Sequence, residues 1–92
     1  MTQDTKWDVR FTKGATKQFD RLNPAIRRQI NRYIFERLAT DKDPKRFGKP
    51  LTGEMRGLWR YRIGDYRLIC EIKNATLVIL VAHVAHRREV YD

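Results

Sequence analysis

The chain has 92 residues, of which 41% are apolar, so it can bury one modest hydrophobic core but not two. Its 20 lysines and arginines exceed its 11 acidic residues and give a net charge of +9. Such an excess in a small protein favours a polyanionic partner, with nucleic acid the first candidate, although charge can also serve solubility alone. We expect a single domain over residues 1–92.

The same composition excludes several classes of protein. The opening stretch has no apolar run of the kind found in signal peptides, and no segment is long enough to cross a bilayer, so we expect a cytoplasmic protein without a membrane partner. The single cysteine, Cys70, excludes an intramolecular disulfide, and no zinc motif is present. We therefore expect neither a metal nor a cofactor.

The first stretch with a regular pattern is "WDVRFT", where Trp7, Val9 and Phe11 alternate with polar residues. This alternation predicts a short strand with one buried face. Thr12 can then cap a helix that runs to about Leu22, because its hydroxyl can accept a hydrogen bond from an amide of the first turn.

A second helix is predicted from Asn23, a favourable cap residue, followed by Pro24 at the first helical position, and it runs to about Ala39. An apolar stripe at the helical period is formed by Ile26, Ile30, Tyr33, Ile34 and Leu38. Much of the remaining surface carries Arg27, Arg28, Arg32 and Arg37. These arginines form either a solvated face or a contact to a phosphate backbone.

Residues Thr40 to Gly57 read "TDKDPKRFGKPLTGEMRG", and their prolines and glycines predict a loop. A loop of this length is often functional or mobile. Its cations are candidates for contact with RNA, and they are Lys45, Arg46, Lys49 and Arg56.

Three strands are then predicted, at about Leu58 to Ile63, Tyr66 to Lys73 and Thr76 to Ala85. The order of one strand, two helices and three strands predicts an α+β fold. Its sheet is small and largely antiparallel, and the two N-terminal helices pack on one face.

The pair Gly64 and Asp65 between two alternating runs is typical of a two-residue type II′ hairpin. Its register sets Ile63 opposite Tyr66, Arg62 opposite Arg67, Tyr61 opposite Leu68 and Arg60 opposite Ile69. Paired residues project to the same face, so Arg60, Arg62 and Arg67 gather on one face. The other face receives Tyr61, Ile63, Tyr66, Leu68 and Cys70.

Like charges directly opposite one another destabilise a sheet, and the pairing of Arg62 with Arg67 breaks this rule. Broken local rules tend to mark functional sites, and arginine offers a planar fork that matches phosphate oxygens. We therefore predict a phosphate-binding face. The alternative is a solvated face on which long side chains splay apart and salt screens their charges.

The last strand, "TLVILVAH", is apolar at both parities. If Asn74 and Ala75 form a two-residue turn, the arginine face also carries Val78, Leu80, Ala82 and His86, with His83 on the opposite parity; a slip of one residue reverses this assignment. Apolar surface beside the arginines could receive a partner protein.

Three stretches in this order and spacing, "KPLTG", "GLWRYRIGDYRLICEI" and "VAHRREVY", resemble the RelE toxins of bacterial type II toxin–antitoxin pairs, within the RelE/ParE superfamily. The likeness covers nearly the whole chain. It implies a small antiparallel sheet with two helices, neutralisation by a RelB-like antitoxin, and metal-independent endoribonuclease activity on messenger RNA (mRNA interferase) in the A site of the 30S ribosomal subunit. In such cleavage the 2′-hydroxyl attacks the adjacent phosphorus.

The resemblance also assigns roles to residues. The implied catalytic set is Arg60, Arg62, Arg67, His86, Arg87 and Tyr91. Arg67 and Arg87 would hold the scissile phosphate, and Tyr91 would stack on a base, unless it is only a tyrosine on a frayed terminus.

The family commonly has lysines in the first basic strand, whereas this chain has arginines, which stay protonated, so Arg62 is a doubtful general base. His86 is the nearby group that titrates near neutrality, although it could simply fill the end of a strand.

Two rival functions remain. ParE-like toxins poison DNA gyrase without cleaving RNA, and they generally lack this cationic and aromatic set. A non-enzymatic nucleic-acid-binding module would need only the charge.

Overall fold

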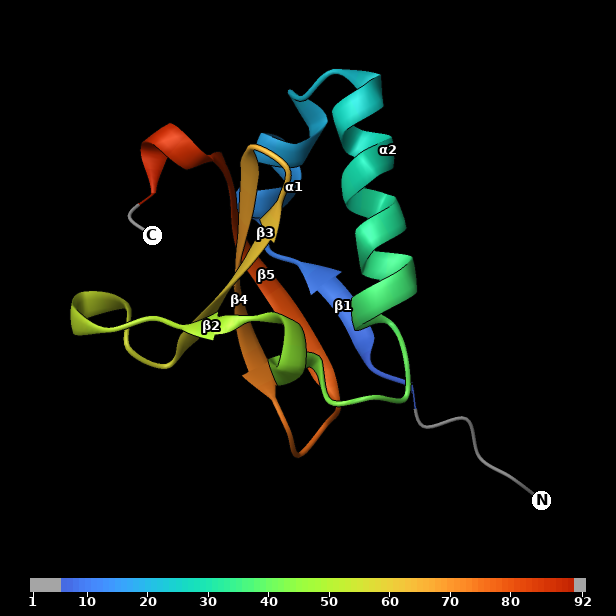
Figure 1. Ribbon diagram of the computed structural model, residues 1–92, viewed down its shortest axis with the longest axis vertical. Coiled ribbons are helices and arrows are strands. Elements are labelled where there is room, and N and C mark those ends of the chain that lie inside the picture. The colour runs from blue at the N-terminus through green and yellow to red at the C-terminus, as the bar shows by residue number, and fades with distance from the viewer. Residues whose placement is uncertain (1–5, 91–92) are drawn as a thin grey trace.

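The computed structural model describes residues 6–90, which form a five-stranded sheet with two helices (Figure 1). The strands are β1 (Asp8–Phe11), β2 (Lys49–Pro50), β3 (Leu58–Ile63), β4 (Tyr66–Lys73) and β5 (Val78–His86), and the helices are α1 (Lys13–Asp20) and α2 (Pro24–Tyr33). The spatial order is β1-β5-β4-β3-β2, with β1 parallel to β5 and every other pair antiparallel. The predicted α+β architecture is confirmed.

Both helices begin at the predicted caps. The Thr12 hydroxyl accepts a hydrogen bond of 3.1 Å from the amide of Ala15, and the Asn23 side chain accepts one of 3.0 Å from the amide of Ile26. Pro24 occupies the start of α2, where its missing N–H leaves no hydrogen bond unmade. These local contacts fix where each helix starts, and hence how it meets the sheet.

A π-helical turn, Ile34–Leu38, extends α2 and carries it to the predicted end. It closes through a hydrogen bond of 2.8 Å from the amide of Ala39 to the carbonyl of Ile34. The wider turn keeps Leu38 on the buried stripe, while Phe35 is 77% exposed.

The segment predicted as a loop contains more structure than expected. It forms the 3₁₀ turns Pro44–Phe47 and Gly53–Met55, and between them strand β2, which pairs Lys49 with Arg60 and Pro50 with Trp59. A proline is tolerated there because β2 is an edge strand and needs no donor on its outer side. The sheet therefore has a fifth strand, and the predicted order lacked it.

The predicted register of the hairpin is confirmed at all four pairs, from Ile63 opposite Tyr66 to Arg60 opposite Ile69. The φ of Gly64 is +58°, whereas the φ of Asp65 is not positive, and this combination fits a type II′ turn. The side chains of Tyr61, Ile63, Leu68 and Cys70 are buried in the core as predicted.

The pairing of β4 with β5 differs from the prediction. The connection has four residues, because Lys73 pairs with Val78, and the ladder then shifts between Cys70, opposite Val81, and Ile69, opposite His83. Ala82 is therefore an extra residue in β5, and such a bulge reverses the faces beyond it. His83 joins the face of Ile69, and His86 lies opposite Tyr66 on the helix side, which corrects both histidine assignments.

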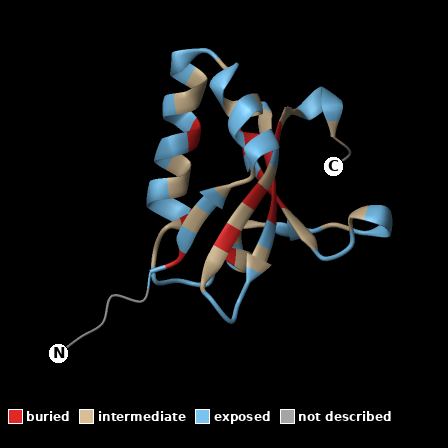
Figure 2. Ribbon diagram, turned by 180° about the vertical axis from the view of Figure 1, so that it is seen from behind, coloured by how far each residue is buried: buried red, intermediate tan, exposed pale blue. Residues whose placement is uncertain are grey.

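The core lies between the two helices and one face of the sheet, where buried residues run along the central strands and reach the inner side of α2 (Figure 2). Burial raises the pKa of the Cys70 thiol and of the Tyr61 phenol well above their usual values. No helix within residues 6–90 is long and apolar enough to cross a membrane.

The Tyr61 hydroxyl donates a buried hydrogen bond of 2.8 Å to the carbonyl of Pro44, which joins the first 3₁₀ turn to the sheet. Tyr61→Phe should lower the free energy of unfolding by about 1–3 kcal/mol, because the buried carbonyl loses its partner. Chemical denaturation measures the change. Tyr33→Phe, which removes a hydroxyl from the neighbouring ring without touching this bond, is the matched control. Equal stability of the two variants would contradict the assignment.

Candidate functional site

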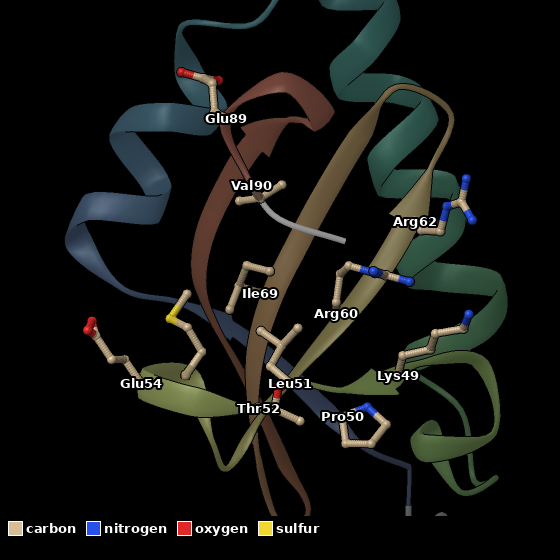
Figure 3. Close-up of a pocket in the computed structure, with 11 residues that line it drawn as sticks. Lys49, Pro50, Leu51, Thr52, Glu54, Arg60, Arg62, Ile69, Glu89 and Val90 are labelled. Atoms are coloured by element: carbon tan, nitrogen blue, oxygen red, sulfur yellow. The ribbon is translucent and has the colours of Figure 1, made fainter.

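The sheet face opposite the helices carries an open hollow of about 790 Å³. Its cationic wall is formed by Lys49 of β2 with Arg60 and Arg62 of β3, as the close-up shows (Figure 3). Lys49 and Arg60 are direct partners in the ladder, so their side chains lie on the same face. Three positive charges from two adjacent strands thus face one cavity.

The other wall of the hollow is largely apolar. It is formed by Leu51, Met55, Ile69 and Val90, and the remaining lining residues are Pro50, Thr52, Glu54 and Glu89. Residues 6–90 contain no group of three or more His, Cys, Asp and Glu side chains that could hold a metal ion. The lining of the hollow therefore combines fixed positive charge with apolar area and the two carboxylates of Glu54 and Glu89.

Arg60, Arg62 and Arg67 lie on one face, as the register predicts, but they differ in exposure. Arg62 is exposed, whereas Arg60 and Arg67 are only 5% and 1% exposed. A buried guanidinium is costly without hydrogen bonds. Nη1 of Arg67 donates to the carbonyls of Gly64 and Tyr66 at 3.1 and 3.0 Å. The charge exposed to a ligand is therefore mainly that of Arg62, with Arg60 behind it.

Arg87 is held at the hairpin turn by Asp65. Its amide donates a hydrogen bond of 2.7 Å to the Asp65 carbonyl, and its Nε lies 3.6 Å from the Asp65 carboxylate. Both side chains are more than half exposed, so the ion pair contributes little energy and the backbone bond carries the attachment. The turn therefore places Arg67 and Arg87 at the same end of the sheet.

His86 lies away from the hollow and caps the short 3₁₀ turn Arg87–Glu89. Its Nδ1 accepts a hydrogen bond of 3.2 Å from the amide of Arg88, and its own amide donates one of 3.0 Å to Glu89. Its ring meets Tyr66 edge-on, with centroids 5.3 Å apart, in a smaller hollow that Gln18 also lines. The expectation that His86 shares the arginine face is wrong, because the bulge at Ala82 turns it to the helix side. His83 is the exposed histidine on the arginine face.

The four cations of the segment between α2 and β3 are spread out rather than gathered. Lys49 lines the hollow, Arg56 is exposed beyond the second 3₁₀ turn, Lys45 lies 5.9 Å from the centre of the Trp59 ring, and Arg46 lies 4.3 Å from the centre of the Phe47 ring. Tyr91 lies outside the described residues. The apolar wall was not anticipated: the expectation of apolar surface beside the arginines rested on β5, and no residue of β5 lines the hollow.

The ParE toxin family of type II toxin–antitoxin systems (parDE) matches residues 9–91. Two toxins of Mycobacterium tuberculosis are similar: RelG is 33% identical over 92% of this chain and 95% of its own length, and RelE is 31% identical over 99% and 92%. The toxin–antitoxin complex RelBE2 of the same organism contains a chain of the same fold, with a TM-score of 0.81, 32% identity and coverage of 92% of this chain and 98% of that one.

The isolated Escherichia coli RelE toxin shares the fold at 21% identity, with a TM-score of 0.68 and coverage of 87% of this chain and 83% of that one. Two helices on one face of a small, mostly antiparallel sheet give this chain a RelE-like toxin fold. The chain belongs to the RelE/ParE superfamily of toxins from type II toxin–antitoxin systems.

Gly64→Ala should destabilise the fold by about 1–2 kcal/mol, because a φ of +58° is unfavourable for alanine. The added Cβ would also stand 2.8 Å from the side-chain nitrogen of Gln29, a flexible group that can move. Adding Gln29→Ala should therefore recover little of the loss in thermal unfolding.

Gly14→Ala is the matched control, because a Cβ there meets nothing within 4 Å in the helix α1. It should raise stability by about 0.5–1 kcal/mol. If the two substitutions had the same effect, the turn would not be the constraint described.

Proposed function

We propose that this toxin cleaves messenger RNA in the ribosomal A site. The observation that supports it is the hollow in which Lys49, Arg60 and Arg62 line one wall, on the face of the sheet that the helices leave open. The 2′-oxygen forms a bond to the adjacent phosphorus while the bond from phosphorus to the 5′-oxygen breaks. The products carry a 2′,3′-cyclic phosphate and a 5′-hydroxyl.

The arginines act by stabilising negative charge on the phosphorus as the new bond forms. Arg62 is exposed and contacts a phosphate oxygen directly, and Arg87 approaches from the hairpin turn. Arg60, nearly buried beneath the hollow, adds its positive charge to the wall. Arg67 is 1% exposed and holds two carbonyls of the turn, so it reaches the scissile phosphate only if the side chains around it move.

Proton transfer needs a group that titrates near neutrality, and arginine does not. Because His86 lies on the helix side, the histidine on the arginine face is His83. Arg60 of β3 pairs with Ile69 of β4, and Ile69 pairs in turn with His83 of β5. We assign the exchange of protons with the 2′-hydroxyl or the leaving 5′-oxygen to His83. Tyr91 keeps its proposed role of stacking on a base to orient the nucleotide for in-line attack.

The proposed partners are the 30S A site, its messenger RNA and a RelB-like antitoxin. Solved relatives include RelB–RelE complexes, among them that of Pyrococcus horikoshii, 25% identical with a TM-score of 0.68. An acidic antitoxin segment would complement the net charge of +9 and fold over the cationic wall.

The second candidate function is gyrase poisoning, which the ParE description of the matching family favours. The hollow and the RelE and RelG relatives favour RNA cleavage instead. Purified toxin is mixed with programmed ribosomes, with naked RNA, and with gyrase plus plasmid. Codon-positioned cuts on ribosomes alone support the proposal. Inhibited supercoiling with intact message would replace RNA cleavage with gyrase poisoning as the function. If neither effect is seen, the remaining function is that of a non-enzymatic nucleic-acid-binding module.

Arg62→Ala should lower kcat/KM for cleavage on ribosomes by about 10²–10³-fold, because one donor to the developing charge is lost. Primer extension over time measures the rate. Arg28→Ala removes another exposed arginine, one that lies on α2 and does not line the hollow, and should leave the rate within about twofold. An Arg62→Ala variant as fast as the parent would exclude the cationic wall from catalysis.

His83→Gln should lower kcat for cleavage on ribosomes by about 10²-fold or more, because the group proposed to exchange protons is lost, whereas His86→Ala should leave kcat nearly unchanged. His86→Ala should instead lower stability by about 1 kcal/mol through loss of the cap on the last 3₁₀ turn. Cleavage rates and thermal unfolding of both variants separate the two roles. A rate lost in the His86 variant and kept in the His83 variant would reverse the assignment.

A further inference from the structure

The apolar wall of the hollow contributes nothing to a purely electrostatic contact with a ligand. Contact with a phosphate chain needs cations alone. Leu51, Ile69 and Val90 lie on one side of Arg60 in the close-up, whereas Lys49 and Arg62 lie on the other (Figure 3). The cavity thus has a cationic side and a largely apolar side, and the largely apolar side also carries Glu54 and Glu89.

The two sides are held on fixed backbone. Ile69 belongs to the central strand β4 and is only 1% exposed, so it forms a floor rather than a movable side chain. The amide of Leu51 donates a hydrogen bond of 2.9 Å to the carbonyl of Leu58, and the amide of Met55 donates one of 3.3 Å to the carbonyl of Thr52. The wall therefore keeps its position relative to Arg60 and Arg62.

A ligand that fits both sides joins an anionic group to a flat, weakly polar one. A nucleotide has this form, and about 790 Å³ is ample for one. We propose that Leu51 and Met55 bind the base of the nucleotide whose phosphate is held by Lys49 and Arg62. This inference rests on the proposed RNA substrate and adds the element that selects the base.

The chemistry of the wall also predicts the preference. Contact with aliphatic side chains is worth more for a base with more apolar area to bury, so a purine is favoured over a pyrimidine. The segment between β2 and β3 then determines specificity, while the cations of β2 and β3 bind every nucleotide alike.

The test uses the whole toxin, without ribosomes, titrated with inorganic phosphate, uridine 3′-monophosphate and adenosine 3′-monophosphate and followed by NMR chemical shifts. Affinity should rise in that order, with adenosine monophosphate about tenfold tighter than phosphate. Leu51→Ala and Met55→Ala should each reduce this difference about threefold or more and leave phosphate binding unchanged. Arg62→Ala should weaken all three ligands together.

Phe35→Ala is the matched control, because it removes an exposed apolar side chain from the helix side of the molecule. It should change none of the affinities, and thermal unfolding verifies that every variant is folded. Equal affinity for phosphate and both nucleotides, or no detectable binding of the nucleotides, overturns the inference.

Cleavage on ribosomes separates this inference from the proposed function. Loss of purine preference in the mapped cuts made by the Leu51 and Met55 variants supports the inference. A parent toxin that cuts no message refutes the proposed function even if the nucleotides bind as expected. Variants that lose affinity for an acidic antitoxin peptide but keep their nucleotide affinities would assign the wall to the antitoxin and overturn the inference.

Discussion

The arrangement of charge in this toxin depends on the two-residue turn at Gly64 and Asp65. A left-handed φ at Gly64 closes the hairpin in one register, and that register places Arg60 and Arg62 on the open face of the sheet. The carbonyls of the same turn accept hydrogen bonds from Arg67 and from the amide of Arg87. This one short backbone segment thereby fixes the register of the hairpin and holds Arg87 beside it.

The turn also resolves the repulsion expected between Arg62 and Arg67. The two residues are direct cross-strand partners, yet Arg67 folds back onto carbonyl oxygens while Arg62 extends into solvent. Hydrogen bonds to carbonyl oxygens compensate the burial of a guanidinium, so the two charges need not meet. The two arginines, which the sequence suggests would repel one another, thus have different roles: Arg67 binds the turn, and Arg62 is available at the surface.

What could be predicted from sequence follows the range of the interactions. The caps at Thr12 and Asn23 and the hairpin register depend on adjacent residues, so sequence carries them. Strand β2 was not predicted because a proline in a short segment is typical of a loop, whereas in the structure the segment pairs with β3. The bulge at Ala82 could not be predicted, because β5 is apolar at both parities and so has no alternating pattern that a bulge would interrupt. The missed bulge placed His86 on the wrong face of the predicted sheet. The burial of Arg67 depends on the whole fold and could not be read from residue type.

The pairing of β1 with β5 has a consequence for synthesis of the chain. Asp8 lies beside Val78 in the sheet, and α1 packs on β5, so β1 and α1 cannot complete their contacts before β5 has been synthesised. Contacts of such sequence separation close late in folding. A nascent chain that lacks β5 has neither a completed sheet nor the support on which Arg87 stands. A product truncated before β5 therefore cannot complete the sheet, and it also lacks Glu89 and Val90 of the hollow.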